Sequence, residues 1–225
     1  MPRPSRRIDQ VLLASGRALF PSTGCARLSV RALTEHAGVN QAMFHYHFKT
    51  KAAFLDTLLQ QLYEEMFAAL SIEVRNDGPA LRRLEHALVT IARFARENRS
   101  VLARVWIDAL GGEAVALDFF RRNAPRHVGV LTALLEQAER EGSLRAMPPL
   151  QRFMFMMGSV LMPIVFAAEV FEAAPELKKL RGAFESQVLS DAAIGERVSL
   201  ALAAIGFGID PLTPTRRPAR RGASA

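Results

Sequence analysis

Apolar positions recur every three or four residues along most of the chain, which is the spacing of one face of an α-helix. The first such segment runs from about Ser5 to Phe20, with Ile8 and Leu12 on its apolar face. We expect Pro21–Gly24 to end this helix. The period-two alternation of half-buried strands is not seen, and clusters of Val, Ile and Thr are few. The pattern therefore predicts an all-α protein.

Two short helices follow the first, each with recognisable end signals. Ser29 is expected to cap a helix that reaches His36, and Gly38 to end it in the left-handed conformation. Asn40 is expected to cap the next helix, which reaches about His47. Two short helices joined by a turn of this kind indicate a helix-turn-helix motif, whose second helix enters the major groove of DNA.

The rest of the chain predicts longer helices and a basic tail. Thr50 is expected to cap a helix that ends near residues 76–79, and Pro125 allows a kink in a later one. The further helices are expected at 81–97, 100–110, 113–141, 150–173 and 190–207. Residues 174–189 are ambiguous but allow a short helix. The Pro- and Arg-rich tail, residues 213–225, is expected to be disordered.

The second helix of the motif separates into two faces when its residues are placed about 100° apart. Its inward face carries Phe44 and Phe48, which are expected to pack with Val30, Leu33 and Val39. Its exposed face carries Gln41, Ala42, His45 and Tyr46. An exposed face that mixes amide, methyl, imidazole and phenol groups can read base edges. The alternative is a capped surface turn with no partner.

Individual side chains on this face suit individual contacts with DNA. Gln41 can pair bidentately with adenine, and Ala42 can contact a thymine methyl group. Phosphate contacts are expected from His45, Tyr46, Lys49, Thr50 and Lys51. His45 and His47 are two residues apart and point to different helix faces, so they do not indicate a shared metal site.

Positive charge is concentrated at the two ends of the chain. Residues 1–51 contain eight Lys and Arg against two acidic residues, and the tail from Thr213 contains four arginines and no acid. The 161 residues between them carry 17 basic and 20 acidic side chains. This asymmetry favours a polyanionic partner, either nucleic acid or an acidic membrane surface. The alternative is a basic surface that contacts only solvent.

The single cysteine and the amino terminus bear on cysteine chemistry and on the cellular compartment of the protein. Cys25 alone excludes an internal disulfide framework and a cysteine-based zinc site. It is expected to be an ordinary small residue, with a redox-sensing thiol as the alternative. The basic amino terminus lacks the apolar core of a secretory signal, which indicates a cytoplasmic protein.

One stretch, Phe153–Ala168, has no charged residue. It is shorter than the roughly 20 apolar residues of a membrane-spanning helix and contains Gly158 and Pro163. We therefore expect no membrane partner, and predict a helix that is buried in a core or in an oligomer interface. A monomer core is the alternative to a dimer interface here and in the small-residue helix 190–207.

Aromatic and methionine side chains in the central region predict a mostly apolar cavity between the helices of residues 62–170. Its lining is expected to include Phe94, Trp106, Phe119, Met157 and Phe166. Such a lining suits a small hydrophobic ligand. The alternative is that these side chains simply fill the core. No nucleophile–base pair, phosphate-cradling glycine loop or metal-ligand cluster is visible, so neither an enzyme nor a cofactor is expected.

Residues 8–59 resemble the amino-terminal domain of TetR-type transcriptional regulators. The resemblance rests on Leu19-Phe20, Gly24, Ser29-Val30-Arg31-Ala32-Leu33, Ala37-Gly38-Val39, Met43-Phe44-x-x-His47-Phe48 and Lys51-x-x-Phe54. It implies a helix-turn-helix domain at residues 1–50, a ligand-binding and dimerising helical domain at 51–212, and a tail at 213–225. It also implies that Arg31 and Gln41 contact bases and that His47 and Lys51 contact phosphates. Two positions depart from the family pattern, which usually has tyrosine at His45 and often threonine at Met43.

The function expected from the residues and the resemblance together is that of a homodimeric regulator. It would be a repressor on a palindromic double-stranded DNA operator, released by a small hydrophobic molecule. One rival function is DNA binding without sequence preference or ligand, which would give similar affinities for random and cognate DNA. The other is attachment to a membrane surface through the basic ends, which would not need the face of Gln41.

Overall fold

The computed structural model describes residues 5–167, 170 and 174–206, and every regular element in this part of the chain is helical. The prediction of an all-α protein is confirmed. The expected tail at 213–225, the last residue of the helix expected to end at Phe207, and residues 168–169 and 171–173 lie outside the described residues.

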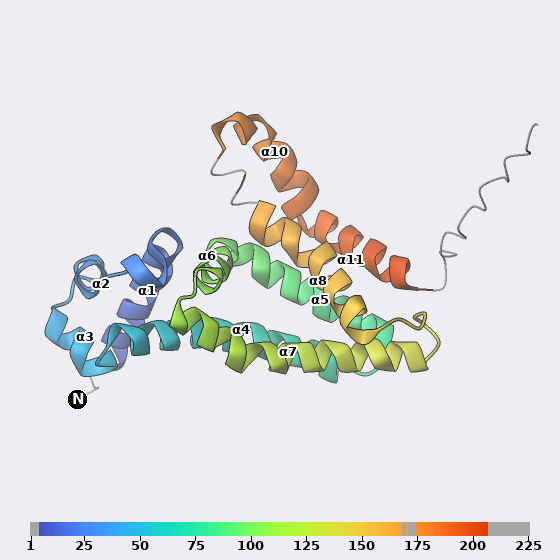
Figure 1. Cartoon of the computed structure of the whole chain (residues 1–225), viewed down its shortest axis with the longest axis horizontal. Coiled ribbons are helices and arrows are strands. Elements are labelled where there is room, and N and C mark those ends of the chain that lie inside the picture. The colour runs from blue at the N-terminus through green and yellow to red at the C-terminus, as the bar shows by residue number, and fades with distance from the viewer. Residues whose placement is uncertain (1–4, 168–169, 171–173, 207–225) are drawn as a thin grey trace, which may run out of the picture.

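The first three helices form a compact unit at one end of the molecule (Figure 1). They are α1 (Ser5–Arg27), α2 (Val30–Ala37) and α3 (Gln41–Phe48). The predicted caps are confirmed: Ser29 Oγ accepts from the Ala32 amide, and Asn40 Oδ1 accepts from the Met43 amide. Gly38 ends α2 at φ 66° and ψ 29°, in the left-handed region where a residue without a Cβ is favoured.

The first helix runs past the expected end at Phe20, and the break that was expected at Pro21–Gly24 falls at Gly24. Helix α1 continues through Pro21 to Arg27, and its only non-helical residue is Gly24, at φ 65° and ψ −172°. In this stretch the hydroxyls of Ser22 and Thr23 both donate to the Leu19 carbonyl, at 3.0 and 2.9 Å. Pro21 offers no N–H to the Arg17 carbonyl, yet the helix continues past it.

The body of the molecule consists of longer helices whose positions follow the predictions within a few residues, except that the helix expected at 150–173 is α-helical only as far as Met162. They are α4 (Lys51–Arg75), α5 (Ala80–Glu97), α6 (Arg99–Leu110), α7 (Ala114–Arg140), α8 (Pro149–Met162) and α11 (Asp191–Ile205). Thr50 caps α4 as expected, accepting from the Ala53 amide. Helix α7 runs through Pro125 without interruption. Helix α8 is continued by a π-helical stretch, η1 (Pro163–Ala167).

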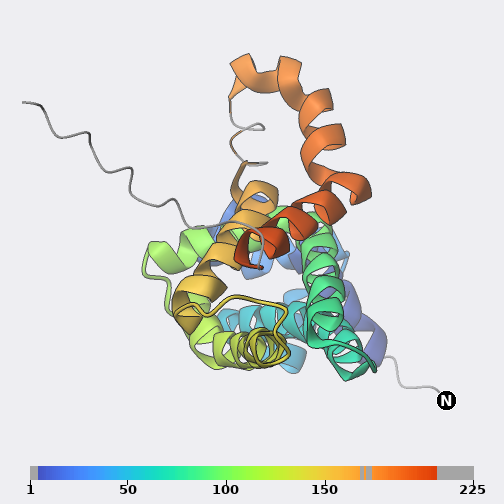
Figure 2. The same ribbon diagram turned by 90° about the vertical axis from the view of Figure 1, so that its right-hand side faces the viewer.

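The ambiguous segment 174–189 is helical in short pieces that project from the body. It consists of η2 (Pro175–Leu180), α10 (Arg181–Phe184) and η3 (Glu185–Leu189). We call residues 175–189 the arm. Both views show the arm rising on the side of α8 and α11 that faces away from α4 and α7 (Figures 1 and 2). The short helix that the sequence allowed in this segment is therefore present.

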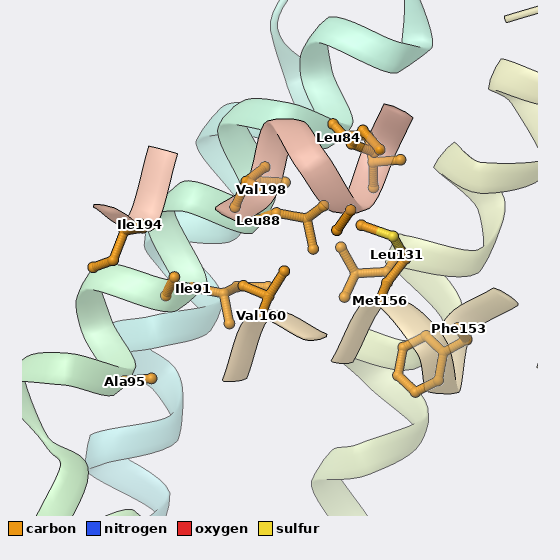
Figure 3. Packing of buried hydrophobic residues seen from close by; sticks show 14 of the residues in the cluster. Leu84, Leu88, Ile91, Ala95, Leu131, Phe153, Met156, Val160, Ile194 and Val198 are labelled. Carbon is orange, nitrogen blue, oxygen red and sulfur yellow. The ribbon is translucent and has the colours of Figure 1, made fainter. Parts of the chain in front are cut away.

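Two apolar clusters hold the fold together. In the body, α5, α7, α8 and α11 bury a cluster that includes Leu88, Leu131, Met156 and Val198 (Figure 3). The second cluster joins α1–α3 to the first half of α4 and to residues of α6 and α7, among them Val105 and Phe119. Because α4, α6 and α7 contribute to this second cluster, the amino-terminal unit is packed firmly onto the body.

A buried arginine secures the chain where α7 gives way to α8. Arg152 is 0% exposed, and its guanidinium donates to the carbonyls of Leu135, Arg145 and Met147 and to the carboxylate of Glu139. The sequence showed this residue only as a charge beside an apolar run. Its partners lie 5 to 17 residues away in the chain, so no local pattern reveals them.

Candidate nucleic-acid interface

The face of α3 that is predicted to read bases is exposed, as the helical wheel predicts. Gln41, Ala42, His45 and Tyr46 all face solvent, and Tyr46 is 72% exposed. The opposite face, Phe44 and Phe48, is buried against Phe54 of α4, with ring centroids 5.5 and 5.0 Å from that ring. These contacts fix the rotation of α3 about its own axis, so its exposed face is presented in one orientation.

The turn between α3 and α4 holds two of the predicted phosphate-binding residues, Lys49 and Thr50. The Thr50 hydroxyl is occupied as the cap of α4. Lys49 has φ 61°, an uncommon value for a residue with a Cβ, and its carbonyl lies 3.1 Å from Nδ1 of His45. The Lys49 side chain is exposed beside α3, so its ammonium group is available to an anion.

Lys51 is occupied by the protein rather than by solvent. Its ammonium group donates to the carbonyls of Cys25 and Ala26, both at 3.0 Å. These are carbonyls at the end of α1, where a positive charge interacts favourably with the helix dipole. The geometry gives Lys51 a role in joining α4 to α1, which the sequence did not suggest, and leaves one ammonium proton for a phosphate.

Two other predicted contacts are also engaged within the chain. Arg31 is exposed but pairs with Glu35 one turn later, with Nε 2.7 Å from Oε1. The Nε2 atom of His47 is buried without a hydrogen-bond partner, next to the ring of Tyr46 at a centroid distance of 5.1 Å. A phosphate contact from His47 would therefore have to use Nδ1, and Arg31 would have to leave Glu35 to reach a base.

A polar junction ties the end of α1 to α6. Asp108 is buried and accepts from the backbone N–H of Cys25 at 2.7 Å and from Nε and Nη2 of Arg104 at 2.9 and 2.5 Å. Gly24 lies against Arg104 so closely that a Cβ there would meet Nε at 2.2 Å. The junction needs the glycine, and the glycine therefore explains why α1 breaks at this residue.

The ionisation of this junction argues against a redox role for Cys25. Burial, together with the hydrogen bond to Asp108, raises the pKa of the Cys25 thiol to about 12. Burial would also raise the pKa of Asp108, but its bonds from Arg104 and Cys25 outweigh that effect and hold it below the ordinary value. The charge stays on Asp108, and Cys25 stays a protonated thiol with little nucleophilic character.

The five predicted ligand-lining residues do not come together. Phe94 and Phe119 belong to the cluster beneath α1–α4, whereas Met157 and Phe166 pack against the body cluster. Trp106 is the only one of the five that is exposed, and its ring contacts Phe120 at 4.5 Å and Phe166 at 6.3 Å. Trp106 and Phe166 therefore remain the pair that can share a ligand.

The pockets of the described part of the chain include two shallow ones. One, of about 390 Å³, lies between the start of α4 and the start of α7, and the other, of about 330 Å³, lies between α1 and the turn from α5 to α6. Both are rich in charged side chains, and none of the five predicted ligand residues lines either of them.

A polar cluster between α4 and α7 was missed by sequence reasoning. The Tyr63 hydroxyl donates to the Asn123 carbonyl at 2.9 Å and lies 3.4 Å from Nδ1 of His127. Burial lowers the pKa of His127 below its ordinary value, so the ring is neutral at pH 7. Gln60 and Asn123 exchange two amide hydrogen bonds across the same helices. Helical periodicity places these residues on the buried face but cannot pair them.

Comparison with known proteins agrees with the geometry of the amino-terminal unit. Residues 12–58 match the family described as bacterial regulatory proteins, tetR family. A protein of Marinomonas named nucleoid occlusion factor SlmA is 28% identical over 139 residues, which are 62% of this chain and 68% of that protein. The protein of the same name from Aliivibrio fischeri is 29% identical over 97 residues, 43% of this chain and half of its own length.

The fold of the whole chain is also shared with solved structures. A TetR-family transcriptional regulator from Agrobacterium tumefaciens superimposes with a TM-score of 0.65 and 18% identity, covering 90% of this chain and all of that one. This likeness extends over the helical body as well as α1–α3. The chain therefore shares the fold of TetR-family transcriptional regulators, and its residues 12–58 match the model of that family.

Proposed function

We propose that the protein is a dimeric repressor that binds a palindromic operator through the exposed face of α3 and leaves it when a hydrophobic molecule binds. The observation that carries the proposal is the presentation of Gln41, Ala42 and Tyr46 on a short helix whose rotation is fixed by Phe44 and Phe48. An amide at the start of a recognition helix suits bidentate pairing with adenine. Because the repressor acts on chromosomal DNA, we place it in the cytoplasm.

The phosphate contacts around this face are proposed according to which side chains are not already bonded within the protein. Lys49 and Tyr46 are exposed and are proposed to hold phosphates, with the remaining proton of Lys51 as a third donor. Three other residues are proposed as weaker contacts, because each is already occupied. Thr50 caps α4, His45 lies against the Lys49 carbonyl, and His47 has its Nε2 atom buried. Arg31 is proposed to exchange Glu35 for a base edge when DNA binds.

Replacing Gln41 by alanine is expected to weaken cognate binding by about 1–3 kcal/mol and to relax the preference at one base pair. The probe is a duplex enriched from a random-sequence pool by repeated binding to the full chain, called here the selected duplex. Fluorescence anisotropy compares it with a scrambled duplex. Gln10→Ala is the matched control, because Gln10 is an exposed glutamine on α1, and it should change neither affinity. Equal losses on both duplexes would contradict base reading by Gln41.

The dimer interface is proposed to be the outer face of α8 and α11. By length and composition, Pro149–Ala167 is apolar enough to cross a membrane, yet only 33% of its most apolar window is buried. Leu150, Met154, Phe155 and Met162 of α8, and Leu200 of α11, are exposed. Such a continuous apolar face on a soluble regulator needs a cover, and a second copy supplies an identical one.

Small residues on the same face support close approach of two copies. A Cβ added at Gly158 or Gly195 would meet nothing within 4 Å, and Ala192 and Ala203 are exposed on α11. A two-fold dimer built here places two α3 helices on one duplex, about one helical turn or a multiple of it apart. Light scattering should then give about twice the chain mass of 24.8 kDa, and a monomeric mass at micromolar concentration would contradict the dimer.

The ligand is proposed to be hydrophobic and to bind beside Trp106 and Phe166. Phe94, Phe119 and Met157 are proposed to line the site only after α6 moves, because they lie in two separate clusters in this structure. Movement of α6 would reach α1 through Asp108 and Cys25, and so change the spacing of the two reading helices. The ligand acts by preferring that second arrangement.

A screen of apolar compounds tests the ligand with two readouts. A regulatory ligand should raise the melting temperature, because it binds the folded state, and should also release the selected duplex in the anisotropy assay. Compounds that stabilise the protein across a broad screen while duplex affinity stays unchanged would contradict the regulatory role.

Sequence similarity favours a second candidate, a role in nucleoid occlusion. The curated relatives from Marinomonas and Aliivibrio fischeri carry that name, although they match only part of this chain. A repressor should occupy one or a few promoters, whereas an occlusion factor should occupy many sites distributed over the chromosome. A map of chromosomal binding sites therefore separates the two candidates.

A further inference from the structure

The arm has a firmly packed base and an unpacked tip. Phe184 and Leu189 are buried in the body cluster. The carbonyls of Leu189 and Val188 accept from Arg96 at 3.0 Å and from Arg197 at 2.6 Å. These bonds fix the direction in which the arm leaves the body. Toward the tip, Leu180 is 51% exposed, so an apolar side chain is held away from the core of its own chain.

The direction of the arm places it beside any partner that docks on α8 and α11. The buried faces of these helices point toward α5 and α7 (Figure 3), so their exposed faces point the opposite way. The arm rises on that same side in both views (Figures 1 and 2). A second copy seated on α8 and α11 therefore lies alongside the arm.

A separate apolar surface, the α6–α7 patch, is left without a cover in the described part of the chain. It consists of Trp106, Ile107 and Leu110 of α6 and Leu117 of α7, all exposed, with Leu110 at 80%. The Trp106 ring contacts Phe120, which joins the residues of the two helices into one surface. The patch is not part of the α8–α11 face, so the proposed dimer interface does not account for it.

We propose that the arm of each protomer packs across the α6–α7 patch of its partner, with Leu180 as the apolar contact. The proposal rests on the dimer described above. Helix α6 contacts η1, and η1 contacts η3 at the base of the arm, so patch and arm lie at the same end of the α8–α11 face. A two-fold axis that runs along the length of this face, as is needed to bring both α3 helices to one duplex, keeps the partner's arm at that same end.

The chemistry of the two surfaces is compatible with this contact. Lys179 and Glu176 are exposed near Leu180, and Asp118 and Arg121 are exposed near Leu117, so an apolar centre on each side is flanked by both signs of charge. Burial of the arm would also cover Trp106, which lies beside Phe166. The partner's arm would thus close the proposed ligand site, and ligand binding would become coupled to dimerisation.

Photo-crosslinking tests the exchange of arms. Leu180 is replaced by the photoreactive residue benzoylphenylalanine in full-length chains, half of them labelled with heavy isotopes. After mixing, exchange and irradiation, mass spectrometry should find mixed heavy–light peptides that join position 180 to residues 106–121. The same replacement at Ile72, an exposed apolar residue near the far end of α4, is the control and should give no such peptide.

Separate outcomes distinguish failure of the arm contact from failure of the dimer. A dimeric mass with crosslinks only within one chain would overturn the arm exchange and leave the dimer intact. A monomeric mass for the unaltered chain would overturn both. Met154→Glu should give monomers and remove the mixed peptides. Leu180→Asp should weaken dimerisation about tenfold, and an unchanged dimerisation constant would also overturn the proposal.

Discussion

Replacing Arg152 by methionine is expected to lower the free energy of unfolding by about 3–5 kcal/mol. Methionine fills a similar volume but donates no hydrogen bond. The carbonyls of Leu135, Arg145 and Met147 would then be left without this donor inside the protein, and Glu139 would lose its ion pair at 2.5 Å. Urea unfolding monitored by circular dichroism measures the change as a lower midpoint at an unchanged slope.

Two further variants distinguish the effect on stability of losing the buried hydrogen bonds from the effect of losing a positive charge. Arg140→Met removes an exposed arginine at the end of α7 and should change stability by less than about 0.5 kcal/mol. Arg152→Lys keeps the charge but loses the planar fork, so its effect should fall between the other two. Equal effects of Arg152→Met and Arg140→Met would show that the buried bonds contribute nothing.

Substituting Gly24 by alanine is expected to cost about 2–4 kcal/mol of stability. At φ 65° and ψ −172° the backbone is in a region that almost only glycine occupies. The added Cβ would also meet Arg104 Nε at 2.2 Å. Arg104 cannot move away without breaking its two bonds to Asp108, so the junction between α1 and α6 would be disturbed as well.

Gly38 provides the matched control, because alanine at this position meets the backbone strain of a positive φ but no steric contact. Its φ is 66°, close to that of Gly24, but a Cβ there would meet nothing within 4 Å. Gly38→Ala should therefore cost only about 1–2 kcal/mol, the price of the left-handed conformation. If the two alanine variants lost the same stability in urea unfolding, the contact between Gly24 and Arg104 would have no energetic role.

Elements with local end signals could be predicted from the sequence, and those governed by distant contacts could not. Ser29, Asn40 and Thr50 cap their helices as expected, because each cap bonds an amide only three residues ahead. Pro21 misled the same reasoning, since the helix continues through it. The break falls at Gly24, beside the junction where Asp108 bonds the backbone of Cys25. Asp108 lies 83 residues away from Cys25 in sequence.

The candidate site shows the same division. The exposed and buried faces of α3 follow from helical periodicity, which is a local property. The occupation of Lys51 by two carbonyls of α1, the burial of His47 Nε2 and the pairing of Tyr63 with Asn123 depend on how helices pack. For the same reason, residue type marked the five aromatic and methionine residues as a cavity lining but could not show that they lie apart in the fold.

A titration of the selected duplex with the unaltered chain tests the central claim most directly. At fixed salt, we expect chains to bind in pairs, with an affinity at least about 10³-fold higher than for a scrambled duplex. Binding of single chains, or equal affinity for the two duplexes, would contradict a dimeric regulator that reads sequence through α3.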